Sequence, residues 1–515
     1  MTLYSDFLAN PYKTDVEYLV EVSAIKLSDG STATFYFSND GYCSMPGDSP
    51  ANTYYLPRLQ NALNFTRSIF NQGKLGGETF PGYGTIQLVN PDGVLDYFND
   101  YSFDSQPIIV RYGQSGWALS EFGVIFSGTA QGIEFNNGGI VIRIRDNQYL
   151  FQKPLQSLNF AGSGGWEGGV SYAGKKKPVC YGECYGVEPV FIDPANLRFQ
   201  FHDAAVNQVI AVYDGGVPLA FTADFANSTL LDASSPGAGR YSTCLAEGKF
   251  KTGSTPVSVV TMDVKGHATG GYISSVADII KHIALNRVAI SGGSVNTASF
   301  TALNALNSAA VGYYRALDTI TAHDCIGDLA DSIGAYWGYN RVGQLIVGRF
   351  TLPTGSSVQT YTSVDVISYE KLPTITPIYE LLFGYKRCWK RHDTNQVLGA
   401  ATAAIRDFLT NEFRFSTNTD TSIQTKWPSA LSLNKNSLLV DSSAAATESA
   451  REFAIFKSKI DGYKLVLRTN PFQRDIGDEI KLQLSRYGLS SGKNFVIVSM
   501  TEDAGSSFIE VEAYG

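Results

Sequence analysis

The strongest constraint on the fold is the period-two alternation of apolar residues in the first 150 positions. Residues 16–22, VEYLVEV, alternate apolar side chains with Glu17 and Glu21, which predicts a half-buried strand. Asp29-Gly30 then turns the chain into TATFYFS, a hairpin signal. Further strands are expected at TIQLV (85–89), IIVRY (108–112), FGVIF (122–126) and GIVIRIR (139–145). We therefore expect antiparallel β structure here, as a barrel or a sandwich.

A second β-rich section is expected after a loop rich in Gly and Lys at residues 161–179. Its strands are predicted at 187–192 and 257–266, because both segments are rich in β-branched residues. A hairpin is predicted within 208–221, where Asp214-Gly215-Gly216 supplies residues that tolerate positive φ.

The pattern changes to helical spacing at residue 274. In SSVADIIKHIA the apolar residues recur every three to four positions, and Ser274 or Ser275 is available as the N-cap. A second helix is expected at 298–310, and a third begins after Thr321 as its cap. The third helix places Ile326, Leu329 and Ile333 on one face. A strand at 344–350 closes this α+β block.

The last section is predicted to begin with a strand at 380–389 and to contain one long helix at 443–460. Four alternating segments then end the chain as a small antiparallel barrel or sheet. The residues expected on the inward face of the helix are Ala446, Ala450, Phe453, Ala454 and Ile460.

These segments predict a multi-domain, mainly β protein with an α+β middle section. The length of 515 residues allows three or four domains at about 150 residues each. The expected domains are an N-terminal barrel-like domain (1–160), a β-rich insertion (161–270), an α+β domain (271–360) and a C-terminal barrel-like domain with the long helix (361–515).

Composition narrows the class of partner. The net charge is −8 and only 17% of residues are charged, so nothing indicates the basic face of a protein that grips duplex DNA. A mildly acidic surface can still pass nucleic acid without retaining it. Many aromatic residues suit large permanent interfaces.

The six cysteines are too sparse for a disulfide scaffold, and we expect reduced thiols. No signal peptide and no run of about 20 apolar residues is recognised.

Residues 169–176, GVSYAGKK, are one residue short of a phosphate-binding P-loop. Position 176 is Lys where the loop needs Ser or Thr, the upstream segment is not an apolar strand, and Pro178 follows where a helix should begin. A dinucleotide fingerprint fails as well, since Gly162 and Gly164 fit but position 167 is Glu. The segment is interpreted as an inter-domain loop. Its lysines, Lys175, Lys176 and Lys177, are expected to be solvated or to contact an acidic partner surface.

Cys180 and Cys184 raise the question of a metal site. Zinc and iron–sulfur sites need four ligands, usually in two close pairs, and no second pair exists in this chain. His202 or His267 could join them only by convergence in space. Buried small thiols are the preferred interpretation.

Other catalytic arrangements are weakly indicated. Cys325 follows His323 by two residues, but a cysteine nucleophile usually takes its histidine from elsewhere in the fold. No G-x-S-x-G or H-E-x-x-H motif occurs, and a glycosidase carboxylate pair is neither supported nor excluded by sequence.

Trp166, Trp117 or Tyr-rich loops could stack on a sugar. The preferred alternative is that Trp166 anchors its loop against a neighbouring subunit.

Several longer strings, taken together and in order, resemble the hub proteins of bacteriophage tail tips and baseplates, of the non-contractile kind with relatives in gene transfer agents. The strings are DGYCSMPGDSPANTYYLPRL (40–59), VNPDGVLDYF (89–98), YAGKKKPVCYGECYGVEPVFIDPANLRFQFHD (172–203), AVYDGGVPL (211–219), AAVGYY (309–314), DSIGAYWGYNRVGQLIVGRF (331–350) and IEVEAYG (509–515).

The resemblance implies an architecture rather than a chemistry. Such hubs are similar to the central hub of contractile tails: they are trimers whose subunits each carry two β-barrel-like domains, and together these form a pseudo-sixfold ring. The implied partners are a distal tail protein, the tape measure protein and a central fibre or tail spike protein, with DNA passing through the lumen. The implied location is the virion tail tip, assembled in the host cytoplasm.

We therefore predict a non-enzymatic hub with no catalytic residue, cofactor or metal ligand to assign. Two alternatives remain open at this point. One is a tail-associated peptidoglycan hydrolase, and the other is a receptor- or glycan-binding tail protein.

Overall fold

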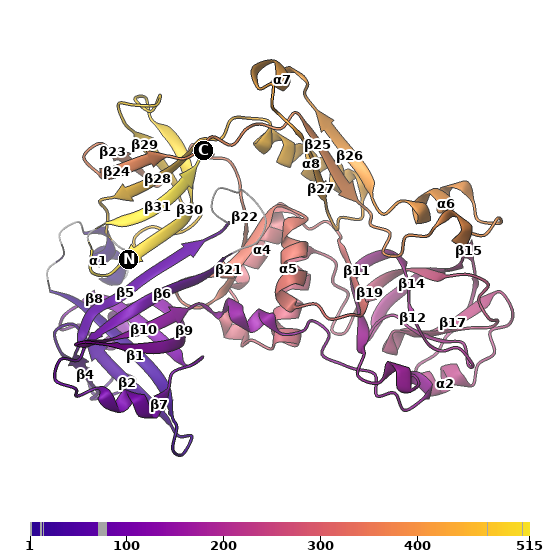
Figure 1. The fold of residues 1–515 in the computed structure, drawn as a ribbon, viewed down its shortest axis with the longest axis horizontal. Helices are drawn as coiled ribbons and strands as arrows, with labels where there is room; N and C mark the ends of the chain where they lie inside the picture. Colours follow the sequence, from indigo (N-terminus) through magenta and orange to yellow (C-terminus); the bar gives the residue numbers. More distant parts are fainter. Residues whose placement is uncertain (1–2, 11–12, 14, 71–79, 471, 507) are drawn as a thin grey trace.

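Strands dominate the computed structural model, which describes residues 3–10, 13, 15–70, 80–470, 472–506 and 508–515. The prediction of a mainly β chain with several sheets and some helices is confirmed. Figure 1 shows the first and last sections of the chain together at one end of the long axis, the helices α4 and α5 in the middle, and the second β section at the other end.

The N-terminal sheet follows the alternation in the sequence. β1 pairs antiparallel with β2, from Leu19 opposite Ser38 to Ile25 opposite Thr32, so the predicted hairpin is confirmed. The segments expected as strands at 85–89, 108–112, 122–126 and 139–145 lie in β6, β8, β9 and β10. The strands of this section are β1 (Val16–Lys26), β2 (Thr32–Ser38), β3 (Tyr42–Cys43), β4 (Tyr54–Pro57), β5 (Leu59–Ser68), β6 (Phe80–Val89), β7 (Tyr101–Ser102), β8 (Pro107–Gln114), β9 (Gly123–Asn136) and β10 (Gly139–Arg145), and α1 is Leu3–Ala9.

The second face of β1 is more buried than its sequence suggests. Leu19 packs with Tyr55 and Phe122 in a small separate core, and Glu17 is only 1% exposed. Burial raises the pKa of Glu17 to about 7. The expectation of a half-buried strand with Glu17 in water is therefore wrong, because the segment between β2 and β5 covers that face.

The C-terminal section forms the other half of the same sheet. Strand β30 pairs with β31 and β29 of its own section. Residues Ser499–Asp503 of β30 also pair with β5 of the N-terminal section, and this pairing produces one sheet of 16 strands. The C-terminal strands are β23 (Gln359–Thr362), β24 (Val366–Lys371), β28 (Gly462–Leu467), β29 (Glu479–Gln483), β30 (Lys493–Asp503) and β31 (Ile509–Tyr514).

This sheet corrects the barrel-like description of the terminal sections. Its path runs from β24 to β3, and no pairing among the described strands closes either half into a barrel. The physical reason lies in β5, which pairs with β6 along one edge and gives its other edge to β30. The two halves nevertheless keep separate cores on either side of this shared edge.

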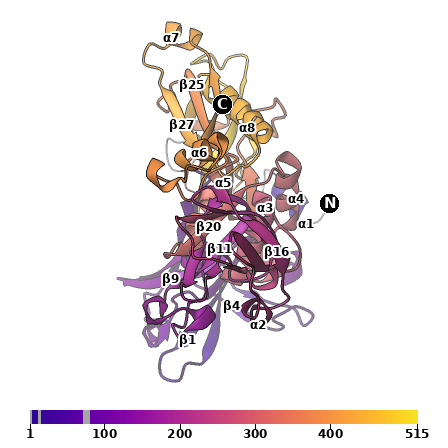
Figure 2. The same cartoon turned by 90° about the vertical axis from the view of Figure 1, so that its right-hand side faces the viewer.

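The second β section consists of two five-stranded sheets. The hairpin predicted at residues 214–216 is confirmed: Tyr213 pairs with Pro218, and Gly215 and Gly216 have positive φ. Its elements are β11 (Lys176–Val187), β12 (Val190–Asp193), β13 (Arg198–Gln200), β14 (Val206–Asp214), β15 (Val217–Pro218), β16 (Ala220–Asp224), α2 (Ser228–Asp232), β17 (Arg240–Cys244), β18 (Lys249–Thr252), β19 (Val260–His267) and β20 (Gly312–Leu317), the last contributed by the helical block. Figure 2 views the molecule from this end.

The helices of the middle block begin where their caps predict. The side chain of Ser275 accepts a hydrogen bond from the Asp278 N–H at the start of α3, and Thr321 accepts one from Asp324 at the start of α5. Ile326, Leu329 and Ile333 are all buried, as expected. The elements are α3 (Val276–His282), α4 (Thr297–Leu306), α5 (Ala322–Asp331), β21 (Ala335–Tyr339) and β22 (Leu345–Arg349).

The largest core extends beyond this block into later residues. Leu381 and Phe383 of β25 and Phe453 of α8 pack with the residues of α3, α4 and α5. The later elements are β25 (Glu380–Tyr385), α6 (Ala403–Thr410), β26 (Arg414–Thr419), α7 (Ser422–Lys426), β27 (Ser432–Asn436) and α8 (Ser442–Phe456). None of the described helices is long and apolar enough to cross a membrane.

Candidate functional site: the junction of the terminal sheets

The junction between β5 and β30 joins residues from opposite ends of the chain. Five residue pairs are in antiparallel register, from Ser499 opposite Ser68 to Asp503 opposite Asn64. Side chains add to the ladder: the hydroxyls of Thr66 and Thr501 are 2.8 Å apart. The Asn61 amide donates to Asp503 Oδ1 at 2.7 Å, across 442 positions of sequence. Alternation predicts each strand, but it does not predict this partner.

Two arginines and two carboxylates form an ion network beside the shared edge. Arg341 binds Glu502 through two contacts, Nη2 to Oε1 at 2.6 Å and Nε to Oε2 at 3.1 Å. Arg67 Nη2 lies 2.8 Å from Asp475 Oδ1 and 3.6 Å from Glu502 Oε2. The Glu502 side chain is only 2% exposed, and it also accepts the Phe472 N–H at 2.9 Å.

Three sections of the chain contribute to this network. Arg67 comes from β5, Glu502 from β30, and Arg341 from the turn between β21 and β22 of the middle block. That turn approaches the N-terminal sheet closely, since a Cβ at Gly343 would lie 2.8 Å from Ser127 Oγ. In return, Phe472 of the C-terminal section packs in the N-terminal core, 5.4 Å from the Tyr112 ring. The junction therefore holds all three sections together.

The electrostatics of the network favour the charged forms. Burial alone raises the pKa of Asp475, but the guanidinium groups of Arg67 and Arg341 hold it below its usual value. Burial lowers the pKa of Arg341, whereas Glu502 and Asp475 raise it by more. Bidentate guanidinium–carboxylate pairs are strong and geometrically specific. Removing one partner of such a buried pair typically costs about 3–5 kcal/mol, because the other charge is left uncompensated.

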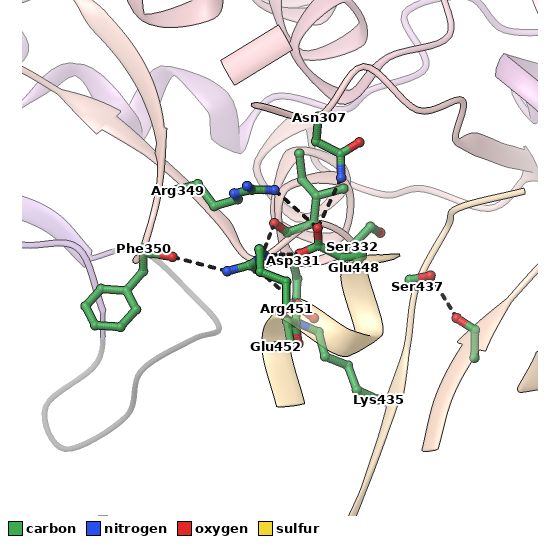
Figure 3. Close-up of polar contacts among 12 residues, drawn as sticks. Asn307, Asp331, Ser332, Arg349, Phe350, Lys435, Ser437, Glu448, Arg451 and Glu452 are labelled. Atoms are coloured by element: carbon green, nitrogen blue, oxygen red, sulfur yellow. Dashed lines mark hydrogen bonds and ion pairs between the residues drawn. The ribbon is translucent and has the colours of Figure 1, made fainter. Parts of the chain in front are cut away.

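A second ion network fixes helix α8 to the middle block (Figure 3). Glu448 lies 3.2 Å from Arg349 of β22 and also pairs with Arg451 one turn along the helix. Glu452 accepts from Lys435 of β27 at 2.9 Å. Both carboxylates are 2% exposed.

These contacts overturn the predicted inward face of α8. Ala446, Ala450 and Ala454 are exposed, whereas Glu448 and Glu452 point inward; of the expected residues only Phe453, and Ile460 beyond the helix end, are buried. The reason is that cationic side chains from two other strands compensate the charge of the buried glutamates. The helical spacing of apolar residues alone does not predict such partners.

The segment that resembles a P-loop binds its own chain. Val170–Tyr172 is a single 3₁₀ turn, and Lys176 begins strand β11, so no helix N-terminus faces a phosphate. Of the three lysines only Lys175 is exposed. Lys177 is largely buried and its Nζ lies 2.6 Å from Glu167, which corrects the expectation of a solvated charge.

Trp166 lies in the same loop as these lysines, and residues from other parts of this chain contact its indole ring. Its indole N–H donates to Asp232 at 3.0 Å, and Arg198 and Lys249 lie over its ring. Trp117 packs against Phe7 at a ring separation of 5.3 Å. Neither indole is presented as a free stacking surface for a sugar.

Cys180 and Cys184 lie side by side on β11 and are both buried. Burial and the neighbouring Cys180 raise the pKa of Cys184 well above its usual value. The histidines considered beside them do come close: the Cys180 N–H donates to His202 Nδ1 at 3.1 Å, and His202 Nε2 lies 3.0 Å from His267 Nδ1. Within the described residues, however, no group of three or more His, Cys, Asp or Glu side chains could hold a metal ion.

His323 and Cys325 both lie at the start of α5 and face the main core, and the cysteine is the more deeply buried of the two. The His323 ring packs 5.1 Å from the Trp337 ring, while Cys325 is completely buried in the main core. Burial raises the pKa of the Cys325 thiol well above its usual value. A nucleophilic cysteine requires the opposite shift, so this pair does not have the properties of a catalytic dyad.

No protein-family model matches the chain, and no curated protein matches it in sequence. In structure the chain is similar to the tail protein from Neisseria meningitidis MC58 (TM-score 0.38, 8% identity, 98% of this chain and 97% of that chain). It is also similar to the 43 kDa tail protein of prophage MuSo2 from Shewanella oneidensis (0.41, 10%, 96% and 98%) and to prophage tail protein gp18 from Listeria monocytogenes EGD-e (0.41, 7%, 98% and 94%).

Proposed function

We propose that this protein is a non-enzymatic structural hub of a bacteriophage tail tip. The observation that carries the proposal is the junction described above: two β sections from opposite ends of the chain share one sheet edge, β5 with β30, and one buried ion network. A hub that contributes two ring segments per subunit needs those segments at a fixed distance and angle. The resemblance of the seven sequence strings to tail hubs points to the same role.

In this proposal three copies close into a ring in which the two terminal sections alternate. Six similar segments in a threefold assembly match the sixfold tail tube on one side and a threefold fibre or spike on the other. A head-to-tail interface between unlike surfaces closes into such a ring when its rotation is 120°. The partners proposed are the distal tail protein, the tape measure protein and the central fibre, at the tail tip of the virion.

We also propose that the chain is divided into four domains, at residues 1–160, 161–270, 271–360 and 361–515. The main core crosses residue 360, since β25 and α8 pack on the helices of the middle block. The ring segments proposed are therefore the strands around β1–β10 and β28–β31, with the remaining residues projecting from the ring.

Mass photometry of the purified chain, alone and with the distal tail protein from the same genome, tests the proposal. We expect a species of three times the monomer mass, and a ring in negative-stain class averages. A chain that stays monomeric at micromolar concentrations with and without the distal tail protein contradicts it. A clear lysis band in a cell-wall zymogram would contradict the non-enzymatic assignment and favour the hydrolase alternative.

A further inference from the structure

A cavity of about 740 Å³ is lined by residues of β11, β14, β19 and α6. Figure 1 places these elements toward the other end of the long axis from β5 and β30. One wall is the polar face of the sheet that contains β11, β14 and β19. The other wall comes from the segment that runs from β25 through α6 to the start of α8. The side chains that matter for its chemistry are Glu183, Tyr185, Tyr213, Asp263, Lys386 and Phe408.

Among the described residues, the two central carboxylates of this cavity accept hydrogen bonds only from neutral groups. Asp263 accepts the Gly186 N–H at 2.9 Å and the Tyr213 hydroxyl at 3.3 Å. Glu183 accepts the Tyr185 hydroxyl. In the part of the chain that the structure describes, neither carboxylate forms an ion pair with a Lys or Arg side chain.

The cations of the lining contact aromatic rings more closely than they contact the two central carboxylates. The Lys386 ammonium sits over the Tyr185 ring, 4.3 Å from its centroid, and the Arg414 guanidinium lies 4.1 Å from the centroid of Phe408. Arg414 also donates to the Phe408 carbonyl at 2.6 Å. The lining carries four carboxylates against these two cations; the carboxylates are Glu183, Asp263, Asp407 and Asp441.

Asp263 shows the cost of its surroundings. Mainly because of burial, its pKa is raised to about 6; Glu183 adds to the rise, while the Gly186 N–H, the Tyr213 hydroxyl and Lys386 lower the pKa without cancelling the effect of burial. A positive group placed between the two carboxylates would supply the missing compensation. Tyrosine rings beside it would add cation–π attraction.

We propose that this cavity binds an organic cation, a primary ammonium or a guanidinium group, between Asp263 and Glu183. Anions are disfavoured by the net negative lining. The volume lies within the range of about 300–1,000 Å³ typical of ligand sites, so it accommodates more than a single side chain. The same chemistry can come from a Lys or Arg side chain of a protein partner or from a free polyamine.

Isothermal titration of the purified full-length chain tests the proposal with four probes: N-acetyl-lysine methylamide, N-acetyl-arginine methylamide, spermidine and the neutral N-acetyl-norleucine methylamide. We expect the cationic probes to bind at least about tenfold more tightly than the norleucine probe, which corresponds to about 1.4 kcal/mol. Tighter binding of spermidine assigns the site to a free polyamine. Tighter binding of a lysine or arginine amide assigns it to a partner's side chain.

Variants locate the binding in this cavity. Asp263→Asn and Glu183→Gln should each weaken cation binding about tenfold or more. Glu188→Gln is the matched control, since Glu188 is exposed and pairs with Lys390 at the surface, and it should bind like the natural chain. Circular dichroism establishes that each variant is folded, and Glu183→Gln serves as the test if Asp263→Asn is not.

Three results would overturn the proposal. They are no binding of any cationic probe at 10 mM (roughly a ceiling for a specific site), equal binding of the norleucine probe, and unchanged affinity in both folded cavity variants. A fourth such result would come from a separate titration with N-acetylchitotriose: preferential binding of this neutral sugar would also overturn the proposal, in favour of a sugar site.

Discussion

The junction of the terminal sheets and the cavity beside β19 both contain carboxylates, buried at Glu502 and partly buried at Asp263, and they differ in what neutralises them. At the junction, Glu502 meets the Arg341 guanidinium in a bidentate pair, and Arg67 lies nearby. In the cavity, Asp263 meets a backbone N–H and a tyrosine hydroxyl. The chain itself supplies a cationic partner in direct contact with Glu502, whereas the hydrogen bonds of Asp263 come from neutral groups.

This difference separates a structural role from a binding role. A buried charge is tolerated when its partner is built into the fold, as at the junction, and removing the partner is then costly. A buried charge without such a partner remains a cost to the folded chain. Regions of the second kind are where ligands gain affinity, because binding relieves a penalty that folding leaves in place.

The largest effect is expected at the junction. Glu502→Gln should lower the free energy of unfolding by about 3–5 kcal/mol, since Arg341 and Arg67 lose their buried counter-charge. Urea unfolding followed by tryptophan fluorescence measures it. Glu510→Gln on the neighbouring strand is the control, because Glu510 and its partner Lys464 are both about half exposed, and its change should be small. Equal effects of the two substitutions would remove the contrast between junction and surface.

A smaller effect is expected for the coupling between Arg341 and Glu502. A double-mutant cycle with Arg341→Met and Glu502→Gln should give an interaction energy of about 1–3 kcal/mol, because the two side chains share two direct contacts. The unfolding midpoints of the four proteins supply the cycle. Additive effects would mean that the turn between β21 and β22 is held to the sheets by packing alone.

The smallest effect is expected at Asp263, and it has the opposite sign. The folded-state pKa of about 6 lies above the ordinary value of 3.8, so this group stabilises the fold below pH 4 and loses that contribution as the pH rises through 6. Between pH 5 and pH 8 the natural chain should therefore lose about 1 kcal/mol relative to Asp263→Asn, which does not titrate.

Thermal unfolding of both proteins across this pH range, at constant ionic strength, measures the difference. A natural chain that gains stability over Asp263→Asn as the pH rises would show that Asp263 is paired with a cation after all.

Local features of the fold are predictable from the sequence, whereas its long-range partners are not. The hairpin at Asp29-Gly30 and the caps Ser275 and Thr321 depend on a few neighbouring residues, and they lie where expected. The pairing of β5 with β30 depends on two strands that are remote in sequence, and alternation specifies a buried face but no neighbour.

The same limit explains why the expected exposure of three charged side chains is wrong. Glu448, Glu452 and Lys177 carry charge, so period and composition assign them to solvent, yet partners from distant segments make their burial tolerable. Arg341 does have a sequence signal, since it lies within the string DSIGAYWGYNRVGQLIVGRF that resembles tail hubs. That string identifies a region of interest and not the pairing with Glu502.

The pairing of β5 with β30 also constrains the order of events during translation. The edge of β5 has no partner until residues 493–503 have left the ribosome, so the N-terminal sheet waits for more than 400 later residues to be made before it is complete (roughly 20–90 s at 5–20 residues per second). Such non-local pairing slows folding and leaves an unpaired edge exposed in the meantime. A chain released early by a premature stop codon would keep that edge open and lack Glu502. Only chains that extend through residues 493–503 can therefore complete this sheet.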